Sequence, residues 1–276
     1  MNDDYLAINR AMWDDRAAAH AASVDYDLDR YLRDPDAISD VVRFDVPRLG
    51  SIDGLRTVHL QCHIGTDTLS LHRLGAQVVG LDLSPASLRE ARSLAERAGA
   101  TIDYVEGDVY DAVRLLGAER FDLVYTGIGA LLWLPEMDRW AATVAGLLSP
   151  GGRLFVREGH PMIGTYEVVD GAAVSRYPYF ATGEPLVFTD DETYVETDLP
   201  LQGLESREWT HSLGEVVAAL LRAGLTLTGL DEHDSVPWPA LPGLMAPHPV
   251  HPGEMRLADH PERMAASFTL RARKPA

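Results

Sequence analysis

The sequence predicts an α/β protein built on a doubly wound, mostly parallel seven-stranded sheet. Between residues 57 and 157, short apolar stretches alternate five times with helical patterns over short connections. This alternation is typical of an open parallel sheet with helices on both faces. A long loop then precedes a final apolar stretch, residues 267–272, which predicts a last strand that returns antiparallel between its neighbours. With 276 residues, the chain can bury a sizeable core in one domain.

Residues 1–50 are expected to form a helical cap. Trp13 lies in a helical pattern over residues 6–22, and a further short helix is expected before residue 50. Irregular structure is expected at Tyr26, Tyr31 and the Asp34–Pro35 turn. The cap is either a layer on the edge of the sheet or a lid over a ligand, with Trp13 or Tyr26 as a wall. Both interpretations stay open at this point.

The core of the sheet is expected in residues 51–160. Strands are predicted at residues 57–60, 78–81, 102–106, 121–125 and 153–157. Ser84 and Pro85 indicate an N-cap and a first helical position, and Gly99 ends that helix. Ligands of such sheets bind at the carboxyl ends of the strands. Those ends carry His59 to Gly65, Asp82, Gly107–Asp108, Thr126 to Gly129 and Glu158 to His160.

The C-terminal half adds material around this core. Residues 161–208 predict an insertion of one or two β-hairpins, because Gly, Pro, Thr and Tyr accompany short alternating stretches. Residues 209–276 predict a helix and two strands, interrupted by a Pro- and His-rich loop at 234–262. Loops of that length are usually functional or disordered. All segments are assigned to a single domain, residues 1–276.

Composition narrows the range of partners. The chain has 24 Lys and Arg against 42 Asp and Glu, a net charge of −18. Few Lys and Arg residues are therefore available to form the basic surface that binding of nucleic acid or an anionic membrane requires. We therefore expect a small-molecule partner, no nucleic acid, no membrane, and a monomer or homodimer. One cysteine, Cys62, excludes an intramolecular disulfide. No apolar run approaches a membrane span, and the acidic start is unlike a signal or transit peptide. The expected location is cytoplasmic.

Four motifs fall at the expected strand ends and turns. They are His59-Leu-Gln-Cys-His-Ile-Gly65, Gly80-Leu-Asp82-Leu-Ser84, Glu106-Gly-Asp108-Val109 and Leu147-Leu-Ser-Pro-Gly-Gly-Arg-Leu154. Together they resemble the class I S-adenosylmethionine-dependent methyltransferases over roughly residues 55–160. The resemblance implies a Rossmann-like methyltransferase fold with S-adenosylmethionine as the cofactor.

The resemblance also implies roles for single residues. Asp82 matches the acid that binds the ribose, and Asp108 matches the acid that accepts from the adenine amino group. The first motif departs from the family's acid and Gly-x-Gly-x-Gly, because His59 replaces the acid and Gln61 and His63 replace two glycines. We therefore expect Gln61 and the cap to hold the methionine end. The full expected cofactor set is Gln61, His63, Gly65, Thr68, Asp82, Leu83, Asp108, Val109, Thr126 and Trp13.

The acceptor side is predicted from the chemistry of methyl transfer. The enzyme must align the acceptor and, for a hydroxyl or protonated amine, remove a proton, a task that suits a histidine. His160 is the expected base with Glu158 beside it, and His63 is the second candidate. The expected pocket residues are Trp133, Tyr26 and His211. Cys62 is expected to pack rather than react, and the histidine spacing predicts no metal.

Transfer of a methyl group from S-adenosylmethionine to an O or N atom of a small-molecule metabolite is the expected activity. An NAD-dependent oxidoreductase shares the strand–loop–helix–strand unit that ends on Asp82, but the G-x-G-x-x-G pattern is missing. A non-catalytic S-adenosylmethionine-binding protein is the third hypothesis, supported by the altered loop at His59, Gln61 and His63.

Overall fold

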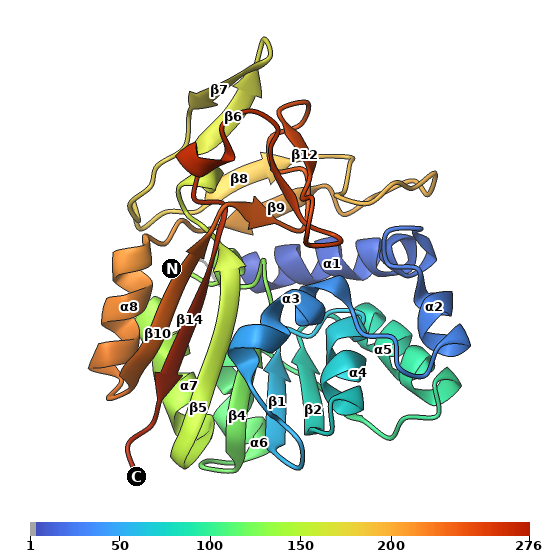
Figure 1. The fold of residues 1–276 in the computed structure, drawn as a ribbon, viewed down its shortest axis with the longest axis vertical. Helices are drawn as coiled ribbons and strands as arrows, with labels where there is room; N and C mark the ends of the chain where they lie inside the picture. The colour runs from blue at the N-terminus through green and yellow to red at the C-terminus, as the bar shows by residue number, and fades with distance from the viewer. Residues whose placement is uncertain (1–3) are drawn as a thin grey trace.

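A seven-stranded sheet lies at the centre of the computed structural model, which describes residues 4–276 (Figure 1). The strand order is β10-β14-β5-β4-β1-β2-β3. The strands are β1 (Arg56–Leu60), β2 (Gln77–Asp82), β3 (Asp103–Glu106), β4 (Phe121–Thr126), β5 (Leu148–Gly159), β10 (Thr226–His233) and β14 (Ser267–Arg273). Strands β5, β4, β1, β2 and β3 run parallel, while β14 lies antiparallel between β5 and β10. The predicted fold class and the antiparallel last strand are confirmed.

Helices cover both faces of this sheet, as the alternating pattern predicted. They are α3 (Asp40–Leu49), α4 (Thr66–Arg73), α5 (Pro85–Arg97), α6 (Ala112–Leu116), α7 (Met137–Leu147) and α8 (Leu213–Arg222). Residues of β4 alternate between the two faces: Val124 packs in one core with Trp140 of α7, whereas Leu123 and Tyr125 pack in another with Val42 of α3. Burial on both faces explains why these strands are short continuous apolar runs in the sequence.

The expected helix caps are present. The Ser84 hydroxyl accepts a hydrogen bond from the backbone N–H of Ser87 at 3.0 Å, and Pro85 is the first residue of α5. Likewise, the Ser212 hydroxyl accepts from the backbone N–H of Glu215 at the start of α8. Each cap satisfies a backbone donor that the first helical turn leaves free, so these helix starts were predictable from local sequence.

The N-terminal cap lies across the carboxyl ends of the central strands. It consists of α1 (Tyr5–Ala22) and α2 (Leu28–Arg33), and Figure 1 shows α1 above the tips of β1 and β2. Helix α1 packs against α5 and the strand β9 (Glu205–Glu208). The expectation of irregular structure at Tyr31 was wrong, because this residue is buried within α2 and packs in a core with Leu69.

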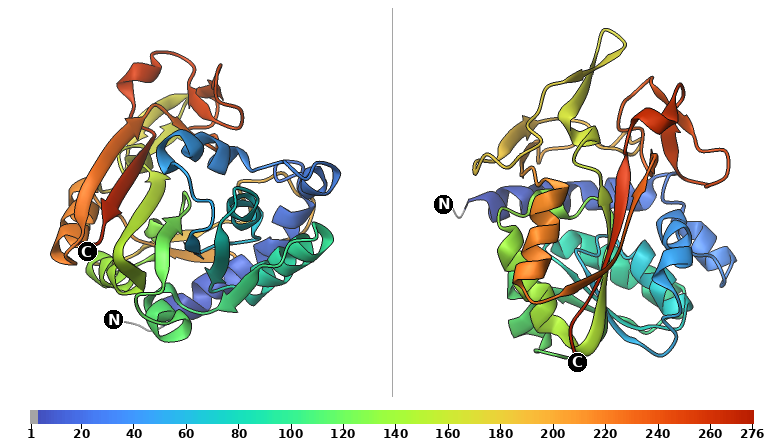
Figure 2. Two further views of the ribbon diagram at one scale, coloured as in Figure 1. Left: turned by 60° about the horizontal axis from the view of Figure 1, so that its bottom comes forward. Right: turned by 60° about the vertical axis from the view of Figure 1, so that its left-hand side comes forward.

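The insertion and the long loop are both ordered, and they lie beyond the same end of the sheet (Figure 2). The predicted hairpins are β6 (Tyr166–Val169) with β7 (Ala172–Ser175), and β8 (Leu186–Thr189) with β9. The loop at 234–262 holds a small sheet of β11 (Ser235–Val236), β13 (Met255–Leu257) and β12 (Met245–Pro247). Short 3-10 turns complete the structure at Val109–Asp111, Leu131–Trp133, Ile163–Thr165 and Pro261–Arg263.

A buried ion pair fastens the long loop to the sheet. Arg157 of β5 donates two hydrogen bonds to the Glu254 carboxylate, at 3.0 and 2.7 Å, and both side chains are almost fully buried. The Ser235 hydroxyl donates to the same carboxylate, and the Arg157 guanidinium lies 3.8 Å from the centre of the Phe44 ring. This contact holds the loop, α3 and the sheet together beside the carboxyl ends of the strands.

Within residues 4–276, the structure contains no helix that is long and apolar enough to cross a bilayer.

Candidate functional site

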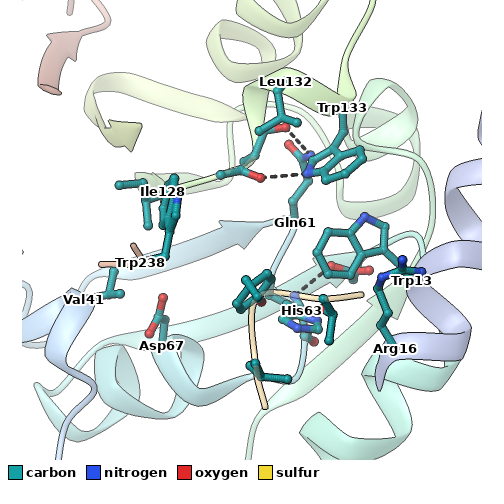
Figure 3. A pocket seen from close by; sticks show the side chains of 18 of the residues that line it. Trp13, Arg16, Val41, Gln61, His63, Asp67, Ile128, Leu132, Trp133 and Trp238 are labelled. Carbon is teal, nitrogen blue, oxygen red and sulfur yellow. Dashed lines mark hydrogen bonds between the residues drawn. The ribbon is translucent and has the colours of Figure 1, made fainter. Parts of the chain in front are cut away.

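A cavity of about 670 Å³ lies at the carboxyl ends of the parallel strands. Its walls come from the sheet, from α1, from the insertion and from the long loop (Figure 3). The strand ends contribute Gln61, Asp82, Asp108 and Gly127, and the covering segments contribute Trp13, Tyr194 and Trp238. Parallel sheets bind their ligands at this end, so the cavity is the candidate active site.

The loop after β1 keeps the backbone shape of a glycine-rich loop although two glycines are missing. Gln61 and His63 adopt φ angles of +56° and +50°, and Gly65 adopts +81°. A side chain at Gly65 is excluded, because a Cβ there would lie 2.7 Å from Ala91 Cβ and from the Tyr104 hydroxyl. The Gln61 amide donates to the Ala130 carbonyl at 2.9 Å, and its buried oxygen has no partner. The left-handed conformation, uncommon for these residues, is thus held by side-chain contacts.

Asp82 ends β2 with its carboxylate on the cavity wall, beside Leu83. One carboxylate oxygen accepts from the backbone N–H of His63 and the other from that of Ser84, each at 2.8 Å. Burial raises the pKa of Asp82 to about 6, and the two N–H donors oppose that shift. The carboxylate therefore organises the loop and stays available as an acceptor for hydroxyl groups of a ligand.

Asp108 occupies the corresponding place after β3. Its carboxylate accepts from the backbone N–H of Tyr110 at 3.0 Å and caps the short turn that contains Val109. Burial raises the pKa of Asp108. Asp108 and Val109 both line the cavity, as expected.

A pair of histidines connects the loop to the cap. His63 Nε2 lies 2.7 Å from His20 Nδ1, and His20 Nε2 lies 2.7 Å from the Thr193 hydroxyl of the insertion. Burial lowers the pKa of His20 to about 4 and that of His63 well below its usual value. Both rings are therefore neutral and can share one hydrogen bond. His20 and Thr193 were missed, because no local pattern links α1 to a residue of the insertion.

Aromatic side chains form much of the remaining wall. The rings of Trp13 and Trp133 meet edge to face, with centroids 5.2 Å apart, and Trp133 Nε1 donates to the Gly129 carbonyl at 2.8 Å. Tyr26 and Trp238 also line the cavity. The cap thus lies over the site, which favours the lid interpretation and the placement expected for Trp13, Tyr26 and Trp133.

Several expected site residues do not line the cavity. Gly65 shapes the loop from behind, the Thr68 hydroxyl lies 2.9 Å from His59 Nδ1, and Thr126 is fully buried. His211 Nε2 bonds to the Leu134 carbonyl at 2.6 Å instead of facing the cavity. These four positions support the walls, and none contacts the cavity directly.

His160 and Glu158 also differ from expectation. The Glu158 carboxylate is saturated by the backbone N–H groups of Gly129, Ala130, Leu131 and Gly159. His160 Nε2 lies 3.0 Å from Glu232 Oε1, while its Nδ1 accepts from the backbone N–H of Met162. Neither residue lines the cavity. Their geometry fits the support of the loop after β4 and disfavours a role as catalytic base.

Two further features of the site are its single thiol and the arrangement of its acidic and histidine side chains. Burial raises the pKa of the Cys62 thiol well above its usual value, so the thiol is a neutral packing group, in keeping with its contact with the β2 glycine, Gly80. Within residues 4–276, no group of three or more His, Cys, Asp or Glu side chains could hold a metal ion.

The fold and the site together define the class of this domain. An antiparallel strand beside a parallel sheet, with acids at the ends of β2 and β3 in one cavity, is the arrangement of class I methyltransferase domains. Residues 58–152 match the family model described as a methyltransferase domain. The core of this chain therefore resembles a class I S-adenosylmethionine-dependent methyltransferase domain.

Similar proteins agree with this assignment. Over 102 residues the chain is 35% identical to the ubiquinone biosynthesis O-methyltransferase of Methylobacterium sp. (strain 4-46), covering 37% of this chain and 40% of that protein. The chain thus spans about two fifths of the length of that curated relative.

Two solved structures share the fold. One is an S-adenosylmethionine-dependent methyltransferase from Mesorhizobium loti, with a TM-score of 0.54, 22% identity and coverage of 86% of this chain and 98% of that chain. The other is the 1,6-didemethyltoxoflavin-N1-methyltransferase of Burkholderia thailandensis, with a TM-score of 0.55, 15% identity and coverage of 100% and 91%.

Proposed function

We propose that this protein transfers a methyl group from S-adenosylmethionine to an O or N atom of a small molecule. The observation that carries the proposal is the position of Asp82 and Asp108. They lie at the ends of adjacent strands and face one cavity, which the aromatic residues of the cap close on the other side. One part of the cavity can bind an adenosine group and the rest is available for an acceptor.

The residues present fit S-adenosylmethionine. Asp82 is an anionic acceptor for the two ribose hydroxyls, and Asp108 with Val109 offers an acceptor and a backbone N–H for adenine. The buried Gln61 oxygen has no partner in the protein, and such groups usually bind a ligand or water. When bound, this cofactor supplies an electrophilic methyl group on a sulfonium centre. The same proposal assigns cofactor contacts to Gln61, His63, Leu83 and Trp13.

The protein's own contribution is to position the acceptor and to exclude water. Alignment of two bound reactants can supply much of the rate enhancement of a displacement. The faces of Trp13 and Trp133 suit a cationic centre, and the cap covers one side of the site. General base catalysis by His63, whose ring lies on the cofactor loop and lines the cavity, remains a prediction.

A small-molecule acceptor is favoured by the enclosure of the site and by the net charge of −18. The named relatives point in the same direction: one is an O-methyltransferase of ubiquinone biosynthesis, and another is an N-methyltransferase of 1,6-didemethyltoxoflavin. The strongly acidic chain has few Lys and Arg residues with which to form a basic surface for nucleic acid. A monomer or homodimer in the cytoplasm is the form we propose.

Binding and transfer test the proposal separately. Titration calorimetry with S-adenosylmethionine, S-adenosylhomocysteine and NAD should detect the first two and not NAD. Incubation with labelled S-adenosylmethionine and a metabolite extract should then label a small molecule. Failure to bind either adenosyl compound would sink the proposal, whereas binding without transfer to any acceptor would favour the non-catalytic alternative.

The NAD-dependent alternative is disfavoured by the topology. Dinucleotide-binding sheets of that class are parallel in the order 3-2-1-4-5-6. Here β14 stands antiparallel next to β5, and the left-handed loop residues Gln61 and His63 replace the glycines of a dinucleotide-binding loop.

Binding of S-adenosylhomocysteine should depend on pH through Asp82. The carboxylate form accepts the ribose hydroxyls, and burial raises the pKa of Asp82 to about 6 in the free protein. We expect the affinity for S-adenosylhomocysteine to be constant above about pH 7. Below about pH 6, the affinity should fall by a factor that approaches ten for each pH unit. Calorimetric titrations from pH 5 to about pH 8 measure this dependence. In the Asp82→Asn variant, the affinity should depend less steeply on pH. If its pH dependence is as steep as in the unchanged protein, another group is responsible for the titration.

The variant His160→Ala should keep methyl-transfer activity within about twofold of the unchanged protein, because His160 does not line the cavity. Its melting temperature should fall, since the backbone N–H of Met162 loses its acceptor. A loss of activity of about 100-fold or more at unchanged cofactor affinity would restore His160 as the base.

A further inference from the structure

The proposed function leaves the charged amino group of the cofactor without an anionic partner. S-adenosylmethionine and S-adenosylhomocysteine carry an α-ammonium group, and a cation in an enclosed cavity needs an anionic or carbonyl partner. Asp82 and Asp108 are assigned to the adenosine part. At the end of β1, the cavity offers His59, whose pKa falls to about 3 through burial and whose ring is therefore neutral. His59 brings no negative charge to this end of the cavity.

Asp67, in the first turn of α4, faces the same space. A Cβ placed on Gly127 at the end of β4 would lie 3.4 Å from His59 Nε2 and 3.5 Å from Asp67 Oδ2. The two side chains therefore converge on one point, next to the loop that carries Gln61. Figure 3 shows the Asp67 carboxyl directed into the cavity on the side of Val41 and Trp238.

The charge of Asp67 is poorly compensated. Burial raises the pKa of Asp67, an effect that Ser39 opposes, and among the ion pairs of residues 4–276 the Asp67 carboxylate takes part in none. The nearby cations are engaged elsewhere: Arg30 pairs with Asp40 at 3.4 Å, and Arg157 pairs with Glu254 at 2.7 Å. A half-buried carboxylate in this situation is stabilised by a cation that a ligand brings.

Other acids on the cavity wall are less suited. Asp40 already contacts Arg30 and Arg43, and Glu208 accepts from the Ser206 hydroxyl in the insertion. Asp25, Asp190 and Glu192 are exposed. Asp67 is set apart by its place beside the ends of β1 and β4 and by its lack of a cationic partner.

We propose that the Asp67 carboxylate binds the α-ammonium group of the methionine part of the cofactor, in place of an acid at residue 59. This inference rests on the proposed function and deepens it. The acid is then supplied by the helix after the loop, seven residues beyond the end of β1.

The test compares three ligands on Asp67→Asn by titration calorimetry. They are S-adenosylhomocysteine, its analogue without the α-amino group, and 5′-methylthioadenosine, which lacks the whole amino-acid part. The variant should bind S-adenosylhomocysteine about 10- to 100-fold more weakly, because a charge-assisted hydrogen bond is lost. The other two compounds should bind within about threefold of their affinity for the unchanged protein, since neither carries the ammonium group.

Asp40→Asn is the matched control, because it removes the same charge from the same cavity at a position that already has cationic partners. Its affinity for S-adenosylhomocysteine should change less than about threefold. An unchanged affinity of Asp67→Asn, or an equal loss for all three compounds at an unchanged melting temperature, overturns the inference. If the unchanged protein binds none of the three, the proposed function fails instead, so the two outcomes are distinguishable.

Discussion

Asp82→Asn should weaken the binding of S-adenosylhomocysteine about 100-fold, the largest effect expected of a single change in the site. Asp82 is an anionic acceptor for two hydroxyls, and hydrogen bonds to charged groups each contribute about 1.5 to 3 kcal/mol. The asparagine keeps one acceptor oxygen for the backbone N–H of His63 or Ser84, so the loop should remain folded. Calorimetry gives the affinity, and circular dichroism checks the fold.

Asp103→Asn is a suitable control for that measurement. Asp103 begins β3, next to the strand that carries Asp82, but it is exposed and does not line the cavity. Its affinity should stay within about twofold of the unchanged protein. A folded Asp82→Asn variant with undiminished affinity would show that the adenosine group lies elsewhere in the cavity.

Glu254→Ala should lower the free energy of unfolding by about 3 to 5 kcal/mol, the usual cost of breaking a buried ion pair. The change leaves the buried Arg157 guanidinium without its two charged hydrogen bonds and removes the acceptor of the Ser235 hydroxyl. Urea denaturation followed by circular dichroism measures the loss. Since Gly253 and Trp238 of the same loop line the cavity, the KM for the acceptor should also rise.

Two further variants separate the contribution of the buried ion pair to stability from other effects. Asp138→Asn breaks the exposed contact with Arg222 and should cost less than about 1 kcal/mol. The double variant Arg157→Met, Glu254→Met removes both charges and should recover at least half of the loss, because no uncompensated charge stays buried. Equal losses in the single and double variants would show that packing of the loop, and not charge compensation, dominates.

The core of the fold was predictable because its signals are local. Apolar runs and the cap at Ser84 each depend on a few adjacent residues, and the resulting βαβ units assemble in very few ways. The turn expected at residues 149–152 is not present, because these residues already belong to β5. Asp82 and Asp108 followed from the same logic, since the end of a parallel strand fixes where a residue lies. The order inside the loop at 234–262 was not predictable, because Glu254 finds its partner Arg157 about a hundred positions earlier in the chain.

The candidate site was predicted in part. The carboxyl end of β5 was identified correctly, but sequence position does not determine side-chain direction, and Glu158 turns toward the backbone N–H groups of the preceding loop. Contributions from the insertion, such as Tyr194, left no local signal. Asp67, in contrast, did leave a local signal in the sequence. An acid in the first helical turn after a loop that lacks its usual acid can be noticed in the sequence, although only the structure shows that it faces the same space as His59.

The loop after β1 has a consequence for the kinetics of ligand exchange. Glycine-rich loops are mobile when empty and lose conformational entropy on binding, whereas Gln61 is tied to Ala130 and His63 to His20 before any ligand arrives. The amide hydrogens of residues 61–65 should therefore exchange slowly with solvent even in the empty protein. Opening of α1 and of the insertion around Thr193 then becomes the step that sets how fast a ligand enters and leaves.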